Sequence, residues 1–166
     1  MTCFKDDSIF AWESDSLTCK YQLRIPEGKP PNFKDFTTTR DGRLLVGGGR
    51  SRYLHVWSLD THKLQRIIEL PKKVTCVRQL AFLADSFDGG SNQVLGVLSQ
   101  DGIMRFININ TCKLLFDVGA LDNRISNVTL SPIGRHIVAI MDNGYINVYC
   151  VKALSEDLNQ VGDLWC

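Results

Sequence analysis

The sequence lacks the segments that would place the chain in a membrane or on a secretory route. No apolar run in the 166 residues approaches the roughly 20 that span a bilayer. The first residues, Met1 to Asp7, lack the basic-then-apolar order of a signal peptide. The formal net charge is only +1, so no overall field draws the chain onto nucleic acid or an anionic membrane. We therefore expect a soluble protein with no nucleic-acid partner and no direct membrane insertion.

Cysteine patterns typical of metal sites are also missing. The six cysteines form no Cys-x-x-Cys pair and no cluster with the three histidines, which argues against a zinc site. Neither a metal nor another cofactor is therefore expected. Most of the cysteines lie in apolar or strand-like stretches, where a free thiol packs as a small hydrophobic group. This usage predicts reduced structural cysteines in the cytoplasm.

What the sequence does contain is an internal repeat. Four β-rich segments each end in an aromatic residue: Ser8–Trp12, Tyr53–Trp57, Ile103–Phe106 and Tyr145–Tyr149. The closing aromatics follow one another at intervals of 45, 49 and 43 residues. Propeller repeats of about 40 to 45 residues contain four strands each. The intervals therefore favour a β-propeller.

Turn-forming residues recur at three places in this repeat. They precede the aromatic strand, as in Asp101-Gly102, lie further upstream, as in Asp41-Gly42, and follow the strand, as in Asn110-Thr111. Gly, Asn and Asp tolerate the positive φ angles of tight hairpins, and three turns per repeat predict an antiparallel four-stranded blade. We assign to equivalent hairpins the three carboxylates Asp41, Asp101 and Asp142.

The predicted fold class is all-β, a partial β-propeller followed by a short C-terminal helical tail. The propeller is expected over residues 1–151, as about three and a half blades, and the tail or linker over 152–166. Its parts are the end of a blade, two whole blades and three strands of a last blade, at 1–23, 32–70, 74–119 and 125–151. Because the first part begins in mid-blade, we expect a C-terminal portion of a longer propeller, whose remaining blades are its structural partners.

The repeat resembles the WD-repeat (WD40) family, whose blades end in Trp-Asp after an Asp-Gly hairpin. The chain departs from that pattern, because no Gly-His dipeptide opens a blade and Trp-Asp is replaced at every copy. The replacements are Trp12-Glu13, Trp57-Ser58, Phe106-Ile107 and Tyr149-Cys150. The hydrogen-bonded Asp-His-Ser/Thr-Trp network of that family is therefore not expected in its usual form.

Two stretches of the sequence resemble one group within this family. Asp85–Phe106 and Thr111–Phe116 are similar to the propeller of WD-repeat proteins that carry a TBC domain downstream and are associated with centrosomes and centriolar satellites. The resemblance implies a non-catalytic protein–protein interaction scaffold in centrosome- and cilium-related trafficking, located in the cytoplasm. The TBC domain is not in these residues, so no GTPase-activating side chain is carried over.

The sequence contains few motifs typical of catalytic sites. Gly47–Ser51 has the glycines of an anion cradle, but no Lys-Ser/Thr follows at P-loop spacing and a strand comes next. The histidines, His55, His62 and His136, lie far apart in the repeat, and a surface or inter-blade position is expected for His55. We therefore predict no catalytic, metal-binding or cofactor-binding residue.

Loops that gather on one face of a propeller are the expected binding surface. We predict a protein-binding rim formed by Arg50, Arg52, Tyr53, Lys72, Lys73, Asp101 and Arg124. Two other classes remain as alternatives. A propeller enzyme or ligand-binding domain would use polar residues in the central channel, and a nucleic-acid-binding propeller would be expected to carry more positive charge.

Overall fold

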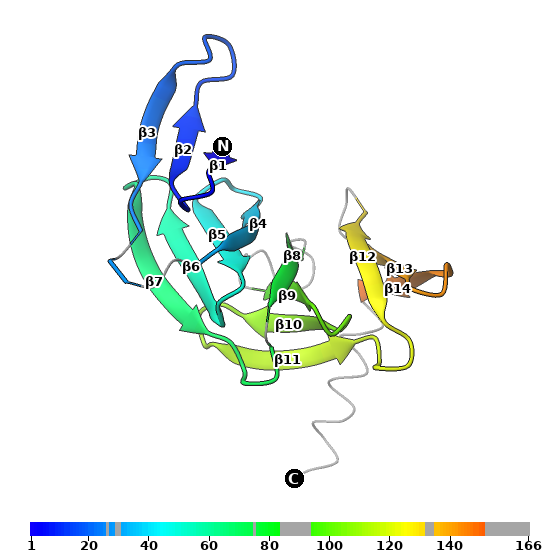
Figure 1. The fold of residues 1–166 in the computed structure, drawn as a ribbon. Coiled ribbons are helices and arrows are strands. Elements are labelled where there is room, and N and C mark those ends of the chain that lie inside the picture. The colour runs from blue at the N-terminus through cyan, green and yellow to red at the C-terminus, as the bar shows by residue number, and fades with distance from the viewer. Residues whose placement is uncertain (26, 29–30, 75, 84–93, 132–134, 152–166) are drawn as a thin grey trace. The chain divides into compact units, whose positions relative to one another are not determined.

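The computed structural model describes residues 1–25, 27–28, 31–74, 76–83, 94–131 and 135–151. Over these residues the chain forms fourteen β-strands in four antiparallel sheets (Figure 1). The strands belong to two compact units, Met1–Arg78 and Gln79–Cys166. The all-β prediction is confirmed, whereas the helical tail expected over 152–166 lies outside the described residues.

The first unit contains two sheets. One has the order β1-β2-β3, from β1 (Thr2–Cys3), β2 (Ile9–Trp12) and β3 (Cys19–Leu23). The other has the order β4-β5-β6-β7, from β4 (Phe33–Thr38), β5 (Leu44–Gly49), β6 (Tyr53–Ser58) and β7 (Lys63–Glu69). Each strand follows its neighbour in sequence, so every connection inside a sheet is a hairpin.

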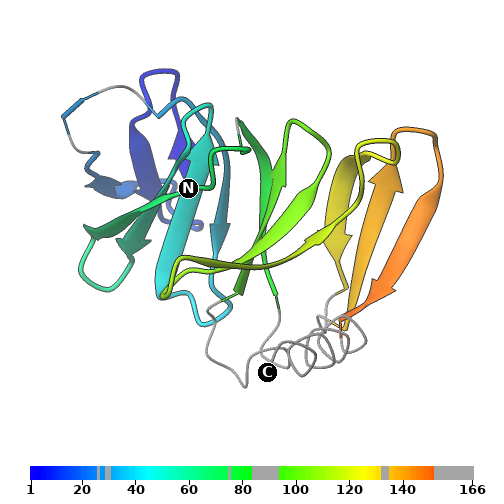
Figure 2. The ribbon, with the colours of Figure 1, turned by 90° about the horizontal axis from the view of Figure 1, so that it is seen from below.

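The second unit repeats this arrangement. The order β11-β10-β9-β8 is built from β8 (Val77–Phe82), β9 (Val94–Ser99), β10 (Met104–Asn108) and β11 (Lys113–Val118), with β8 beginning just before the boundary between the units. The order β12-β13-β14 is built from β12 (Ile125–Leu130), β13 (His136–Met141) and β14 (Ile146–Cys150). Figure 2 shows these last three strands side by side, in yellow to orange.

The hairpins are closed by one recurring side-chain bond. In five turns a carboxylate or amide oxygen accepts the backbone N–H two residues further on, a geometry in which a short side chain replaces a backbone turn bond. The pairs are Asp6 with Ser8 at 3.1 Å, Asp41 with Arg43 at 3.0 Å, Asp101 with Ile103 at 3.2 Å, Asn108 with Asn110 at 2.9 Å and Asn143 with Tyr145 at 3.1 Å. These residues therefore serve the turns in which they lie.

One assignment of these turns was wrong. Asp41 closes the β4–β5 hairpin, whereas Asp101 closes β9–β10, and Asp142 lies between β13 and β14. In the β4–β7 sheet the turn equivalent to that of Asp101 is β5–β6, and Asp41 lies at the opposite end of the sheet from it. The error arose because an Asp-Gly pair fits any tight hairpin, so its position in the repeat is not specified locally.

Trp57 joins the two sheets of the first unit. Its side chain is completely buried and packs with Ile9 and Leu23 from one sheet and Leu45 from the other. Its indole Nε1–H donates to the carbonyl of Arg24 at 3.1 Å, which satisfies the polar atom of a buried tryptophan. The facing apolar sides of the sheets are therefore held together by one aromatic residue of the repeat.

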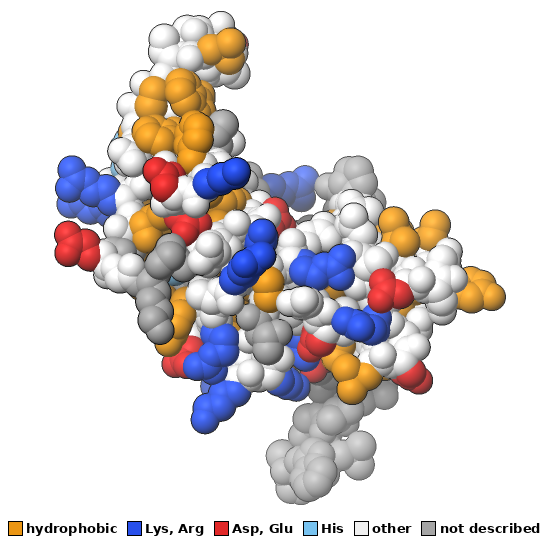
Figure 3. Space-filling model, viewed as in Figure 1, with side chains coloured by type: hydrophobic (Ala, Val, Ile, Leu, Met, Phe, Trp, Pro, Cys, Tyr) orange, Lys and Arg blue, Asp and Glu red, His pale blue; other side chains and the backbone are white. Residues whose placement is uncertain are grey.

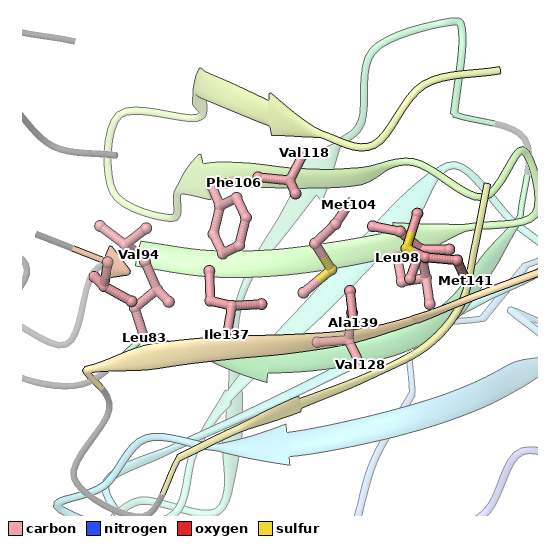
Figure 4. Packing of buried hydrophobic residues seen from close by; sticks show 12 residues of the cluster. Leu83, Val94, Leu98, Met104, Phe106, Val118, Val128, Ile137, Ala139 and Met141 are labelled. Atoms are coloured by element: carbon pink, nitrogen blue, oxygen red, sulfur yellow. The ribbon is translucent and has the colours of Figure 1, made fainter. Parts of the chain in front are cut away.

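The second unit has a matching core. Figure 4 shows Phe106 and Met104 of β10 directed toward Ile137 and Ala139 of β13. All four side chains are buried completely, and Phe106 also stacks on Phe116 with ring centroids 4.5 Å apart. Phe106 therefore has the role here that Trp57 has in the first unit.

Each unit also carries an uncovered apolar sheet face. Phe4 and Trp12 of the first unit are 52% and 41% exposed, and Ile146 and Val148 of β14 are 64% and 62% exposed. Figure 3 shows hydrophobic side chains gathered over the β1–β3 sheet and at the β13–β14 hairpin. Among the described residues no helix is long and apolar enough to cross a membrane.

The cysteines differ from expectation. Cys3, Cys19, Cys112 and Cys150 are exposed, and Cys76 is half-buried; all five are free thiols. The prediction that they pack as small hydrophobic groups was wrong for the four exposed ones. Cys112, for example, lies in the β10–β11 turn with φ at +58°, where the side chain cannot reach the core.

Replacing Trp57 with alanine should lower the free energy of unfolding by about 3–5 kcal/mol, because the cavity adds to the lost burial. The matched change Trp12→Ala, on the partly exposed tryptophan of the neighbouring sheet, should cost less than about 1 kcal/mol. Urea denaturation followed by far-UV circular dichroism measures both. Equal losses in the two variants would contradict the role given to Trp57.

Candidate functional site

In the first unit the β5–β6 turn lies against the segment that follows β7. The Leu70 N–H donates to the carbonyl of Arg52 at 2.7 Å, and the Arg52 guanidinium pairs with the Glu69 carboxylate at 2.8 Å. The neighbouring Tyr53 is 42% exposed. Two exposed lysines, Lys72 and Lys73, follow directly. Five predicted rim residues therefore lie on two adjoining segments of this unit.

The same turn also contacts the segment that leads into β4. The Arg50 N–H donates to the Asn32 carbonyl at 3.1 Å. The N–H groups of Asn32 and Phe33 both donate to the Asp7 carboxylate, each at 2.9 Å. Asp7 is itself 4% exposed. A buried carboxylate in the β1–β2 turn therefore fixes the start of β4, and with it the backbone at Arg50.

A groove of about 490 Å³ opens beside these contacts. Its lining comprises Cys3, Phe4, Lys5, Asp7, Asn32, Phe33, Lys34, Phe36 and Arg50. A second groove, of about 470 Å³, is lined mainly by residues of β3, β7 and the segments beside them, including Gln22, Arg24, His62 and Leu64. His62 stacks there on Tyr21 with ring centroids 3.7 Å apart. Sequence reasoning predicted neither groove, because each draws on segments that are distant in the chain.

In the second unit the two predicted rim residues are in direct contact. The Arg124 guanidinium donates from Nε to the Asp101 carbonyl at 3.0 Å and from Nη2 to the Gln100 carbonyl at 2.7 Å. The Gly102 carbonyl accepts the Ile125 N–H at 2.8 Å. Gly102 has φ at +77°, and a Cβ at this position would overlap the Arg124 side chain. Arg124 therefore fastens the β9–β10 turn to the segment before β12.

Asp101 uses its side chain in a buried ion pair that the sequence did not predict. Arg105 of β10 is only 2% exposed, and its Nη2 donates to the Asp101 carboxylate at 2.6 Å. Ser99 donates its hydroxyl to the same carboxylate at 2.6 Å and accepts from Arg105. The sequence feature that could have predicted this ion pair is a charged residue between the apolar Met104 and Phe106, in a strand that is buried on both faces.

The network determines the protonation of Asp101. Burial alone would raise the pKa of this carboxyl, but hydrogen bonds from Arg105, Ser99 and the Ile103 N–H together hold the pKa below its usual value. The carboxylate therefore stays ionised at neutral pH and keeps the partner that a buried guanidinium requires. Asp101 therefore serves as a structural anion, which pairs with Arg105 and closes the β9–β10 turn.

His55 is the second buried polar residue that needs explanation. It is 6% exposed, stacks on Trp57 at 5.7 Å and meets the edge of Phe33 at 5.3 Å. Its Nδ1 has no hydrogen-bond partner. Burial lowers the pKa of this imidazole, while the Asp7 carboxylate opposes the shift. The neutral form therefore suits the site, and His55 is a packing residue of the aromatic cluster.

The other chemistry-bearing residues are dispersed. His62 and His136 are exposed, and within the described ranges no three His, Cys, Asp or Glu side chains could hold a metal ion. Gly47–Gly49 belongs to β5, and a Cβ at Gly47 would collide with Phe36. These glycines serve close packing of the sheet.

The fold defines the class of the protein. It matches the Myceliophteria thermophila Cps50 (Swd1) β-propeller domain with a TM-score of 0.70, over 91% of this chain and 47% of that chain, at 13% sequence identity. Together with the four-strand repeat, this match shows a β-propeller fold. It is a partial β-propeller, as the sequence predicted.

Relatives with high sequence identity are proteins named TBC1 domain family member 31. The chain is 61% identical to the Xenopus laevis protein and 58% identical to the Homo sapiens protein, each over 161 residues and 96% of this chain. It spans only 15% of the length of those relatives. A more distant match, 26% identical over 129 residues, is the β-alanine-activating enzyme of Drosophila melanogaster, of which the chain covers 11%. No family model matches the chain.

Removing one partner of the buried ion pair should be costly. Arg105→Ala should lower the free energy of unfolding by about 3 kcal/mol, the low end of the range for buried pairs, because Asp101 is partly exposed. The control Lys113→Ala, on an exposed cation of the neighbouring β11, should change it by less than about 0.5 kcal/mol. Urea denaturation at neutral pH compares them, and an Arg105→Ala variant as stable as its control would refute the assignment.

Neutral His55 should make stability depend on pH. Because its pKa is depressed in the fold, the unfolded chain binds a proton that the folded chain does not, and stability is lost as pH falls below about 6.5. The loss from this one group cannot exceed about 1.4 kcal/mol per pH unit. Unfolding between pH 7 and 5 should show a shallower decline in His55→Phe and an unchanged decline in the exposed-site control His62→Gln. An identical decline in His55→Phe would overturn this prediction.

Proposed function

We propose that the chain is a non-catalytic protein–protein interaction scaffold. The observation that supports this most directly is the rim of the first unit. There Arg50 and Arg52 lie on the β5–β6 turn and Tyr53 begins β6, and backbone bonds hold this turn to Asn32 and Leu70. Loops on a rigid sheet are the usual carriers of recognition. Tyrosine and arginine are enriched at protein interfaces, because they combine apolar area with directed polar groups.

The buried polar residues support the same reading. Asp7, Asp101, Arg105 and Arg124 are engaged in holding turns and strands together, and His55 is enclosed by aromatic rings. Catalysis requires such groups within reach of a substrate. These side chains serve the fold instead, whereas Arg50 and Lys72 of the rim are exposed to solvent.

The cellular setting is part of the proposal. The high identity to TBC1 domain family member 31 proteins supports a role as one segment of a larger scaffold. Combined with the resemblance to WD-repeat proteins of centrosomes and centriolar satellites, it supports a cytoplasmic location at those structures and a role in cilium-related trafficking. The partners would be other proteins, because the net charge of +1 provides little attraction for nucleic acid.

Reversing charge at the rim tests the function. The double change Arg50→Glu and Arg52→Glu should lower recovery of partner proteins on the immobilised chain by at least about fivefold, since like-charge contacts oppose binding. The matched control is Arg40→Glu with Arg43→Glu, which changes charge equally in the turn at the opposite end of β5. Quantitative mass spectrometry measures recovery, and circular dichroism verifies folding.

The two double variants separate the outcomes. Loss of the same partners in the rim variant alone supports recognition through the β5–β6 turn. Unchanged capture by a folded rim variant, or equal loss in the control, would count against the rim as the binding surface.

A further inference from the structure

The groove beside β1 and β4 has the chemistry of an acidic-peptide site, and this inference rests on the proposed scaffold function. The groove belongs entirely to the first unit, and its volume of about 490 Å³ lies in the range of ordinary ligand sites. Three of its lining side chains are cations: Lys5 from the β1–β2 turn, Lys34 from β4 and Arg50 from the β5–β6 turn. Segments distant in sequence therefore bring three positive charges to one opening.

The three cations are available to a ligand. All are exposed, and over the described part of the chain none of them forms a salt bridge. Arg52, by contrast, is already paired with Glu69 across the adjacent strands. A lysine or arginine that forms no salt bridge within the fold can bind an incoming anion without breaking an existing bond.

The acidic lining group does not cancel this charge at the opening. The Asp7 carboxylate is buried and accepts the N–H groups of Asn32 and Phe33, so its oxygens are directed into the backbone. Cys3 adds no negative charge at neutral pH, since burial and the Asp7 and Asp6 carboxylates raise the pKa of its thiol. The exposed part of the groove is therefore cationic.

The backbone around the groove is held in place. A Cβ at Gly49 would overlap the carbonyl oxygen of Asn32, because the backbones of these two residues are in close contact. The Arg50 N–H donates to that same carbonyl. The Asp7 carboxylate accepts the N–H of Phe33, the residue after Asn32, and so fixes its backbone. The backbones that carry Lys34 and Arg50 are thus positioned before any ligand arrives, which lowers the entropic cost of binding.

Apolar rings complete the lining. Phe33 and Phe36 are half-buried and pack on each other with ring centroids 4.9 Å apart, and Phe33 also packs against Trp57 at 5.7 Å. Phe4, at 52% exposed, also lines the groove and meets Phe10 edge-on. Because Phe33 and Phe36 are engaged with neighbouring rings, they offer an apolar wall rather than free faces for stacking bases.

We propose that this groove binds an acidic segment of a partner protein, with glutamate or aspartate side chains against Lys5, Lys34 and Arg50 and an apolar side chain against Phe33 and Phe36. Complementary charge selects the partner and speeds its approach. The apolar wall of Phe33 and Phe36 favours binding of a peptide with an apolar side chain over binding of a simple anion. A nucleic-acid strand fits less well, because Phe33 and Phe36 are engaged with neighbouring rings and the chain as a whole carries a charge of only +1.

The test uses the full 166-residue chain and a fluorescein-labelled peptide in which glutamates are interspersed with leucine and serine. Fluorescence anisotropy should show saturable binding that weakens as salt rises from about 0.05 to 0.3 M, because salt screens exposed charges. A peptide of the same length with glutamine in place of each glutamate should bind at least about tenfold more weakly, since it lacks the charge-assisted contacts.

Variants locate the binding. Lys5→Gln, Lys34→Gln and Arg50→Gln combined should raise the Kd of the glutamate peptide at least about fivefold, as expected for three exposed charge contacts. The matched control combines Arg43→Gln, Lys63→Gln and Lys113→Gln, exposed cations outside this groove, and should change the Kd less than about twofold. Urea midpoints of both variants verify that they fold.

The outcomes separate this inference from the scaffold function. Equal binding by the two variants, equal binding of the glutamine peptide, or displacement of the glutamate peptide by single-stranded RNA would overturn the acidic-peptide site. Absence of peptide binding, while partner capture still depends on Arg50 and Arg52, would overturn it and leave the scaffold function standing. Absence of both would end both proposals.

Discussion

The structure depends on apolar contact between facing sheets within each unit. A sheet of three or four strands buries little by itself, and independent stability requires packing on a second layer. Trp57 provides that contact in the first unit, and Phe106 provides it in the second. Both residues come from the third strand in their four-stranded sheets, β6 and β10. The aromatic position of the repeat is thus where adjacent sheets are joined.

Polar side chains then organise the hairpins into a fixed surface. Asp7 joins the β1–β2 turn to the start of β4, and Arg124 joins the β9–β10 turn to the segment before β12. Each connects a turn inside one sheet to the chain entering the next sheet. The charges at the sheet ends therefore fall into two groups. Some, such as Asp7 and Arg124, hold backbone segments, and others, such as Lys34 and Arg50, face solvent and remain open to contact.

The sequence predicted the strands and hairpins because their signals are local. Trp57 marked its strand through its spacing, and Asp101-Gly102 marked a hairpin through the φ angles that the turn requires. Burial of polar groups depends on partners from other strands, so it could not be predicted the same way. His55 was assigned to a surface or inter-blade position, and its enclosure between Phe33 and Trp57 follows only from contacts between side chains of β4 and β6, which flank β5 in one sheet. The rim residues were predicted from the expected positions of loops in a propeller. The groove could not be predicted in that way, because its lining comes from the β1–β2 turn, β4 and the β5–β6 turn, which only the folded structure brings together.

The ion pair of Arg105 helps to determine the geometry of the β9–β10 turn. Pairing a buried arginine with Asp101 adds little net stability compared with an apolar core, because both charges must be removed from water. Its effect is geometric, since Arg105 and Ser99 orient the Asp101 side chain that closes the β9–β10 turn. The backbone carbonyl of that same Asp101 receives Arg124. A polar group inside the second unit thus determines where a surface arginine lies.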